Sequence, residues 1–321
     1  MELSTVSWTT VLLGTPINRW SHSGVGILRD GRLVTSAPGG GELLLIGEQT
    51  GAISAVWAGS AHSHGIEVVE REDGDGDELW IADPGPVGQS GQLIRMRVDG
   101  TVVARLVEPE TTARPEQWKP TSTATVKGTT AHRGDLWIAD GYGRSLVHRV
   151  TATGHTHTFD GSSTGVLFDC PHGIAIDYRA PQPLVAIADR GNERVVFLTL
   201  DGIFVRAVSD GAMPTPSSLA LRGDDLLVTD LRGALLRIDR NDRVHVIVAD
   251  SHGSDREGWP NRVVDGEVVA PEFREGCLNS PHGLAVGPSG AVYLTEWALG
   301  GRIIRLDLEP HGDWLIPPST P

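Results

Sequence analysis

The sequence predicts an all-β protein folded as a six-bladed β-propeller, in a single domain that spans residues 1–321. Short alternating runs of hydrophobic and polar residues are separated by turns that draw on 40 glycines and 20 prolines, a pattern typical of antiparallel β-strands. One four-strand pattern also recurs: residues 168–204 and residues 281–306 share the order Pro-His-Gly, alternating run, turn and alternating run. A recurring four-strand unit indicates a repeat architecture.

Three such units occupy the first half of the chain. The first contains expected strands at Gly24–Ile27, Leu33–Ser36, Glu42–Ile46 and Ala52–Trp57. The second contains His64–Val68, Leu79–Asp83, Gln92–Val98 and Thr101–Leu106. The third contains Thr121–Val126, Leu136–Asp140, Leu146–Val150 and His155–Phe159.

Three further units fill the second half. The fourth contains Ile174–Asp177, Leu184–Asp189, Arg194–Leu200 and a strand after Asp201-Gly202. The fifth contains Ser217–Leu221, Leu226–Asp230, Ala234–Ile238 and Val244–Val248. The sixth contains His282–Val286, Ala291–Glu296 and Arg302–Leu306, with a weaker last strand.

Four-stranded units cannot bury both of their faces alone, so six of them are expected to pack radially. The alternating run Thr5–Leu13 is expected to supply the missing outer strand of the sixth unit and close the ring. An irregular, polar insertion at about residues 250–278 is expected to lie as a loop over one face.

Composition excludes several classes of partner. A formal net charge of −14 argues against nucleic acids and anionic membrane surfaces. Two cysteines are too few for a disulfide framework. The N-terminal residues do not resemble a signal peptide, and no run approaches the roughly 20 apolar residues of a membrane helix. We therefore expect a cytoplasmic protein that acts on a small-molecule or peptide-derived substrate; its oligomeric state is left open.

Histidine recurs at one position of the repeat. The residues that begin the first strands of the six units are, in order, Ser23, His64, Thr121, His172, Ser217 and His282. The histidines are separated by 108 and 110 residues. Alternate blades of a six-bladed ring lie about 120° apart, and their first strands line the central channel. The three imidazoles are therefore expected to converge on the axis.

Three converging imidazoles with an open fourth position are typical of a catalytic zinc site, although another divalent transition metal would also fit nitrogen ligands. A metal at this position would acidify a water or polarise a substrate oxygen. The alternative is that Pro-His-Gly is a turn preference of the repeat and that each histidine is structural. His22 and His62 lie near the same positions and are weaker candidates for a place around the ligands.

At these residues the chain resembles the NHL-repeat propellers and, among them, the peptidylglycine α-hydroxyglycine amidating lyases. His64-Gly65, Pro171-His172 and Pro281-His282 match that family's three ligand motifs, and LWIADGYGRS (Leu136–Ser145) matches its catalytic-tyrosine segment. The resemblance covers most of residues 22–307. It implies a six-bladed propeller that holds zinc through three histidines and cleaves a carbinolamide, with Tyr142 as the catalytic tyrosine.

The chain departs from that family at two functional positions. Pro38 stands where the family has its catalytic arginine, and Gly283 stands where an acidic residue helps to hold calcium. Calcium is therefore not expected by that route. An arginine in a comparable loop, at Arg144, Arg190 or Arg232, is a candidate to replace the missing one. Arg144 is preferred over Arg190, whose surrounding sequence DRGNER is typical of a loop that stabilises the repeat.

These residues lead to a functional hypothesis. Tyr142 would accept or relay a proton, Arg144 would bind substrate, and Glu67, three residues beyond His64, would act as a proton acceptor. The favoured function is a zinc-dependent lyase that cleaves a carbinolamide-type C–N bond. Two alternatives stay open: a metal-dependent hydrolase or lactonase on the same site, and a non-catalytic NHL interaction propeller. The sequence does not choose the substrate.

Overall fold

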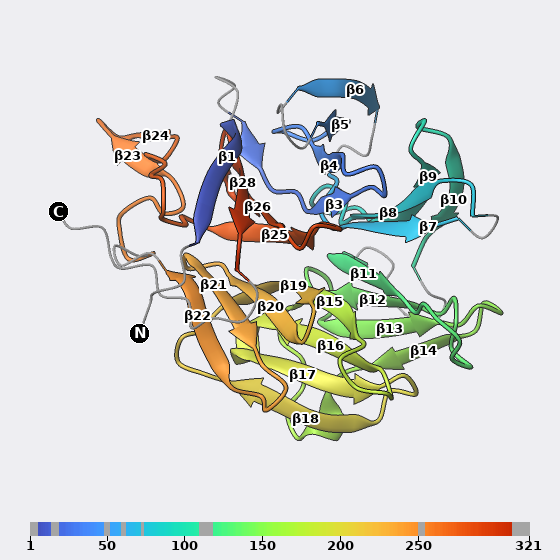
Figure 1. Cartoon of the computed structure of the whole chain (residues 1–321). Coiled ribbons are helices and arrows are strands. Elements are labelled where there is room, and N and C mark those ends of the chain that lie inside the picture. The colour runs from blue at the N-terminus through green and yellow to red at the C-terminus, as the bar shows by residue number, and fades with distance from the viewer. Residues whose placement is uncertain are drawn as a thin grey trace.

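The computed structural model describes residues 6–13, 19–47, 52–58, 62–71, 74–108, 118–249 and 254–309. It consists of six four-stranded antiparallel sheets arranged around a common centre (Figure 1). The six-bladed propeller predicted from the repeats is therefore confirmed. Within the described residues, no helix is long and apolar enough to cross a membrane.

The strands of blades one to three fall where the repeat places them. Blade one contains β3 (Val25–Ile27), β4 (Leu33–Ser36), β5 (Glu42–Ile46) and β6 (Ile53–Ala58). Blade two contains β7 (Ile66–Glu70), β8 (Asp77–Asp83), β9 (Gln92–Arg97) and β10 (Val102–Leu106). Blade three contains β11 (Ser122–Thr125), β12 (Leu136–Asp140), β13 (Leu146–Val150) and β14 (Thr156–Phe159).

Blades four to six complete the ring. Blade four contains β15 (Pro171–Asp177), β16 (Leu184–Asp189), β17 (Arg194–Thr199) and β18 (Phe204–Ser209), with short 3₁₀ turns η2 (Ser162–Thr164) and η3 (Arg190–Asn192). Blade five contains β19 (Pro216–Arg222), β20 (Asp225–Asp230), β21 (Ala234–Ile238) and β22 (Val244–Ala249). Blade six contains β25 (Pro281–Val286), β26 (Val292–Glu296), β28 (Arg302–Asp307) and, as its outer strand, β1 (Ser7–Leu13).

The N-terminal strand closes the ring as the sequence predicts. β1 pairs antiparallel with β28, and Trp8 lies opposite Leu306 while Thr10 lies opposite Ile304. Strands from the two ends of the chain thereby share one sheet, seen side by side in Figure 1. Thr5, the first residue of the expected strand, lies outside the described residues.

The core is divided among the contacts between neighbouring blades. Each of the six blade interfaces holds its own buried cluster, such as Trp137 and Ala124 against Ile174 and Val185 between blades three and four. Each sheet therefore buries both of its faces against its neighbours. This packing explains why the strands are hydrophobic on both faces rather than on one.

The insertion before blade six differs from the loop that was expected. Its described part contains a hairpin of β23 (Arg262–Val264) and β24 (Glu267–Val269), which projects from the ring in Figure 1. A second small ribbon pairs β2 (Trp20–Ser21) with β27 (Ala298–Leu299). Residues 250–253, at the start of the expected insertion, lie outside the described residues.

Truncating a core side chain in the closing blade should measure how strongly closure stabilises the ring. Ile304 is fully buried in the cluster between blades five and six. We expect Ile304→Ala to lower the free energy of unfolding by about 2–5 kcal/mol, because it removes buried apolar surface and leaves a cavity. Urea denaturation followed by tryptophan fluorescence would measure the change.

The matched control is Ile203→Ala, which truncates an isoleucine that is 65% exposed. That substitution should change the free energy of unfolding by less than about 0.5 kcal/mol. Equal effects of the two substitutions would contradict a closure that depends on the packing around Ile304.

Candidate metal centre and catalytic pocket

Carboxylates at the ends of the second strands hold the loops that carry two of the histidines. Asp189 accepts a hydrogen bond from the backbone N–H of Asp169 at 2.8 Å, and Glu296 accepts one from Asn279 at 2.5 Å. Each donor lies three residues before a histidine. Both carboxylates are buried. They therefore hold the backbone just before His172 and His282, at the start of the first strand of each blade.

The three repeat histidines meet at the centre of the ring. The ring centroids of His64 and His282 lie 4.7 Å apart, those of His64 and His172 lie 4.8 Å apart, and those of His172 and His282 lie 5.0 Å apart. All three side chains are buried. One histidine from every second blade therefore forms a nearly equilateral triangle.

Backbone carbonyls orient two of these rings. His64 Nδ1 lies 2.7 Å from the carbonyl oxygen of Thr121, and His172 Nδ1 lies 3.0 Å from that of Ser217. A carbonyl oxygen can only accept, so each Nδ1 carries the proton and each Nε2 presents a lone pair to the centre. The small residues of the odd blades thus supply the acceptors that set the tautomers of neighbouring histidines.

A fourth histidine joins the cluster. Ligand nitrogens of His22, His64 and His282 lie within 4.8 Å of one another, and His22 is half-buried beside them. The sequence indicates His22 as a weaker candidate for a place around the ligands, because it directly precedes Ser23, the blade-one counterpart of the repeat histidines. The sequence therefore provides four imidazoles at the centre, of which three are related by the repeat.

Tyr142 lies in contact with the same group of nitrogens. Its hydroxyl oxygen is 2.9 Å from Nε2 of His172, 3.1 Å from Nε2 of His22 and 3.2 Å from Nε2 of His64. Burial raises the pKa of Tyr142, so the side chain holds its proton at neutral pH. A single hydroxyl proton can satisfy only one of the three nitrogens.

The protonation state of the histidines suits metal binding. Burial lowers the pKa of His64, His172 and His282 well below the usual value. Burial and the charge of Arg190 lower the pKa of His22 to about 4. All four rings are therefore neutral at neutral pH, which is the form that binds metals.

The histidine cluster contains more acceptor nitrogens than there are protons to form hydrogen bonds with them. Nε2 of His64 and Nε2 of His172 are 3.2 Å apart, and both ring nitrogens of His282 are buried without a hydrogen-bond partner. Buried nitrogens without partners are costly. A cation shared among Nε2 atoms would satisfy them together, so these residues fit a divalent transition metal.

Arg190, rather than Arg144, accompanies the histidines. Its guanidinium donates to the Ser217 hydroxyl at 2.7 Å, its Nε is buried without a partner, and its charge contributes to the low pKa of His172. Arg144 instead lies 3.4 Å from Glu108, and no contact joins it to the cluster within the described residues. Among the loop arginines, the structure therefore brings Arg190, rather than the predicted Arg144, to the surroundings of the histidines.

A pocket opens beside the cluster. Its volume is about 500 Å³, and its lining includes Trp20, His22, His62, His64, Lys119 and Tyr142. The Lys119 ammonium donates to the backbone carbonyls of Pro86 and Gln89, each at 2.6 Å. The pocket therefore joins a loop of blade two to the histidines and is large enough for a small organic molecule.

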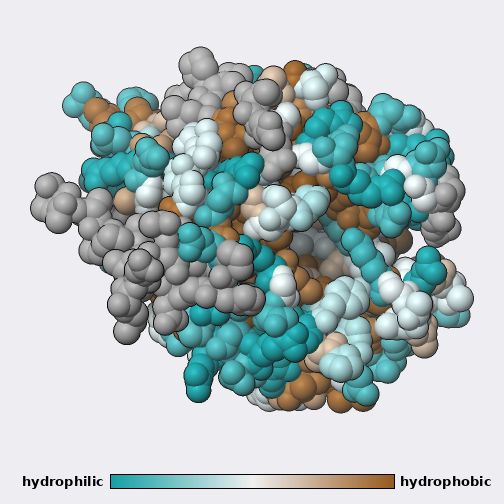
Figure 2. All heavy atoms as spheres, viewed as in Figure 1, coloured by the Kyte–Doolittle hydropathy of each residue, from teal (hydrophilic) through white to brown (hydrophobic). Residues whose placement is uncertain are grey.

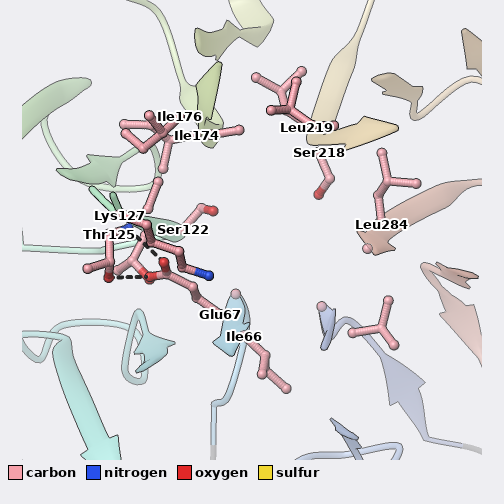
Figure 3. A pocket seen from close by; sticks show the side chains of 18 of the residues that line it. Ile66, Glu67, Ser122, Thr125, Lys127, Ile174, Ile176, Ser218, Leu219 and Leu284 are labelled. Carbon is pink, nitrogen blue, oxygen red and sulfur yellow. Dashed lines mark hydrogen bonds between the residues drawn. The ribbon is translucent and has the colours of Figure 1, made fainter. Parts of the chain in front are cut away.

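Glu67 lies in a different pocket, of about 260 Å³, whose lining shares no residue with the histidine pocket. Its carboxylate accepts hydrogen bonds from the Thr125 hydroxyl and the Thr125 backbone N–H (Figure 3), and from the Thr123 hydroxyl, at 2.6–3.1 Å. Figure 2 shows that hydrophobic residues line a hollow near the middle of one face of the ring. Glu67 is held in place by threonines and does not reach the metal centre.

Gly283 leaves no room for an acidic side chain. A Cβ atom at this position would lie 2.4 Å from the Thr295 hydroxyl oxygen and 2.8 Å from Cα of Gly24. The close approach of blades six and one therefore requires glycine. This packing gives a physical reason for the missing acidic residue.

Comparison with known proteins supports the fold. No protein-family model matches the chain, and no curated protein matches it. A streptogramin B lyase structure superposes with a TM-score of 0.60 at 15% identity, covering 95% of this chain and 98% of that one. The structure of a catalytically inactive histidine-to-alanine variant of virginiamycin B lyase from Staphylococcus aureus with quinupristin superposes with a TM-score of 0.57 at 13% identity. The match covers 95% of this chain and 100% of that one.

A third similar structure is that of a putative oxidoreductase. The putative glucose dehydrogenase from Thermus thermophilus gives a TM-score of 0.54 at 17% identity, covering 94% of this chain and 100% of that one. At these identities the likeness concerns the propeller fold alone. The structural neighbours nevertheless include enzymes, among them lyases.

Proposed function

We propose that this propeller is a metal-dependent lyase that cleaves a carbinolamide-type C–N bond in a small or peptide-derived substrate. The observation that supports it is the excess of inward-facing imidazole nitrogens over the protons that can pair them, around one tyrosine hydroxyl. His64, His172 and His282 would hold the metal, which we take to be zinc, because they are related by the repeat and form the nearly equilateral triangle. The lyases among the structural neighbours show that this fold is compatible with lyase chemistry.

A bound zinc ion would supply a Lewis acid that polarises the substrate hydroxyl oxygen. His22 is neutral, lines the pocket and lies 3.1 Å from the Tyr142 hydroxyl. It therefore accepts the proton of the substrate hydroxyl as the carbonyl forms. Tyr142 donates its own proton to the nitrogen as the C–N bond breaks. The proton on His22 then returns to Tyr142. The products are an amide and an aldehyde or oxoacid, and the enzyme is unchanged.

Arg190 binds an anionic oxygen of the substrate in this scheme. It would take over the role of the arginine that Pro38 replaces, from blade four rather than blade one. The Arg190 Nε has no partner, and the neighbouring Nη2 is held in position by its hydrogen bond to the Ser217 hydroxyl. A planar guanidinium fixed in this way suits bidentate recognition of a carboxylate.

Arg190→Gln should lower kcat/KM by about 10- to 100-fold, the effect of one hydrogen bond to a charged group. The metal content should not change, because the arginine is not a ligand. Steady-state kinetics beside elemental analysis would measure both. Arg144→Gln is the matched control; a loss of activity in that variant and none in Arg190→Gln would contradict the assignment.

The reaction class can be tested directly. Zinc-loaded protein should release an amide and an aldehyde or oxoacid from N-acyl carbinolamides, detected by mass spectrometry, and should leave matched lactones and esters intact. Turnover of the lactones alone would identify a hydrolase instead. A folded protein that binds no transition metal would leave only the interaction-propeller alternative.

A further inference from the structure

A second polar pocket lies between the insertion and blade six. It has a volume of about 200 Å³ and shares no lining residue with the histidine pocket. Four arginines line it together with one glutamate: Arg256, Arg262, Arg274, Arg302 and Glu272. This gathering of arginines is unusual for a chain whose formal net charge is −14.

Only one of the four arginines is fully used by the protein. Arg302 is buried, pairs with Glu296 at 2.7 Å, and donates to the backbone carbonyls of Arg274 and Cys277, each at 2.8 Å. Its charge is therefore neutralised. Arg302 also forms part of the pocket wall, packed against the Phe273 ring.

The other three arginines keep free donors. Arg256 donates one bond to the side chain of Asn279, while its Nε is buried and has no partner. Arg262 makes one long bond of 3.4 Å to the carbonyl of Ala270. Arg274 is exposed, and its guanidinium makes no hydrogen bond or ion pair with any described residue.

The charge of the pocket fits a dianion. Three unneutralised arginines against Glu272 leave two positive charges on its wall. A monocarboxylate would balance only one of them, whereas a phosphate carries close to two negative charges at neutral pH. Guanidinium groups also match the oxygen spacing of phosphate.

We propose that this pocket is a binding site for a phosphate group, as free phosphate or as a small phosphate monoester, distinct from the metal centre. Asn279 holds the Arg256 side chain in this pocket by accepting a hydrogen bond from its guanidinium. The backbone N–H of Asn279 in turn donates to the carboxylate of Glu296. The hairpin insertion brings Arg256, Arg262 and Arg274 to the rim of blade six, which supplies Arg302.

Isothermal titration calorimetry with inorganic phosphate, and separately with glycerol 3-phosphate, tests the site at constant ionic strength. We expect saturable binding of one equivalent. Arg274→Gln should weaken it at least tenfold without loss of stability, because the Arg274 guanidinium makes no hydrogen bond or ion pair with any described residue. Glu272→Gln should tighten it, because it removes a like charge from the pocket. Tighter binding of the monoester would identify an organic phosphate as the ligand, and the reverse order would identify free phosphate.

The control variant is Arg240→Gln, which removes an exposed arginine paired with Asp224 in blade five. This variant should bind phosphate as the wild type does. The proposal is overturned if no saturable heat is observed, if chloride produces the same heat, or if Arg240→Gln weakens binding as much as Arg274→Gln. None of these results depends on the activity of the metal centre.

Discussion

His172→Ala should lose the bound metal and, with it, more than about 100-fold of the activity, since removing even an outer partner of a metal ligand costs roughly 10- to 100-fold. The remaining imidazoles of His64 and His282 form an incomplete set. Elemental mass spectrometry of the purified protein, after reloading with zinc, would show close to one equivalent in the wild type and a small fraction of that in the variant.

His22→Ala separates the two possible triads. If the repeat histidines are the ligands, this variant keeps its metal and loses activity, because it lacks the proton acceptor beside Tyr142. His157→Ala, at an exposed position of β14, should change neither quantity. Retention of metal by His172→Ala and its loss from His22→Ala would assign the site to His22, His64 and His282 instead.

Tyr142→Phe should lower kcat by about 10²- to 10⁴-fold, the range for removal of a general acid or base, while leaving the metal bound. The phenyl ring keeps its packing against His64, 5.0 Å away between ring centroids. Only the hydroxyl, which contacts three Nε2 atoms, is lost. Steady-state kinetics on the carbinolamide substrate would show a change in kcat rather than in KM.

Tyr178→Phe is the matched control, because Tyr178 lines the separate pocket that holds Glu67. Its hydroxyl accepts from the Lys127 backbone N–H at 2.6 Å, so a small loss of stability is expected but no loss of kcat. If Tyr142→Phe retains full kcat, the proton steps must be assigned to another residue. Loss of metal from Tyr142→Phe would indicate that the hydroxyl supports the ligands rather than the chemistry.

Periodicity alone was enough to predict the blades. Alternating runs recur in fours, and a four-stranded unit cannot bury both of its faces alone, so radial packing follows from the sequence. The N-terminal strand was predictable for the same reason, since blade six lacked an outer strand and Ser7–Leu13 alternates. The β23–β24 hairpin was missed because its strands are three residues each, too short for periodicity to reveal.

The convergence of His64, His172 and His282 was also predictable, because equivalent positions on alternate blades lie at one height around the axis. The roles of single residues outside the repeat were not. Arg144 and Arg190 both follow the second strand of a blade, but Arg190 donates to Ser217 whereas Arg144 lies against Glu108. Glu67 is only three residues from His64, yet its carboxylate is held by Thr123 and Thr125 of the neighbouring blade.

The sequence by itself therefore determined the architecture and the three histidines, since both follow from a repeat with a fixed period. The sequence named His22 and Arg190 only among several candidates; the tertiary structure placed both beside the repeat histidines and formed the arginine pocket. Each of these depends on contacts between segments that no period relates: His22 with Tyr142 across 120 residues, Arg190 with Ser217, and Arg256 with Asn279. Such contacts are fixed by packing between blades, which the order of residues along one strand does not encode.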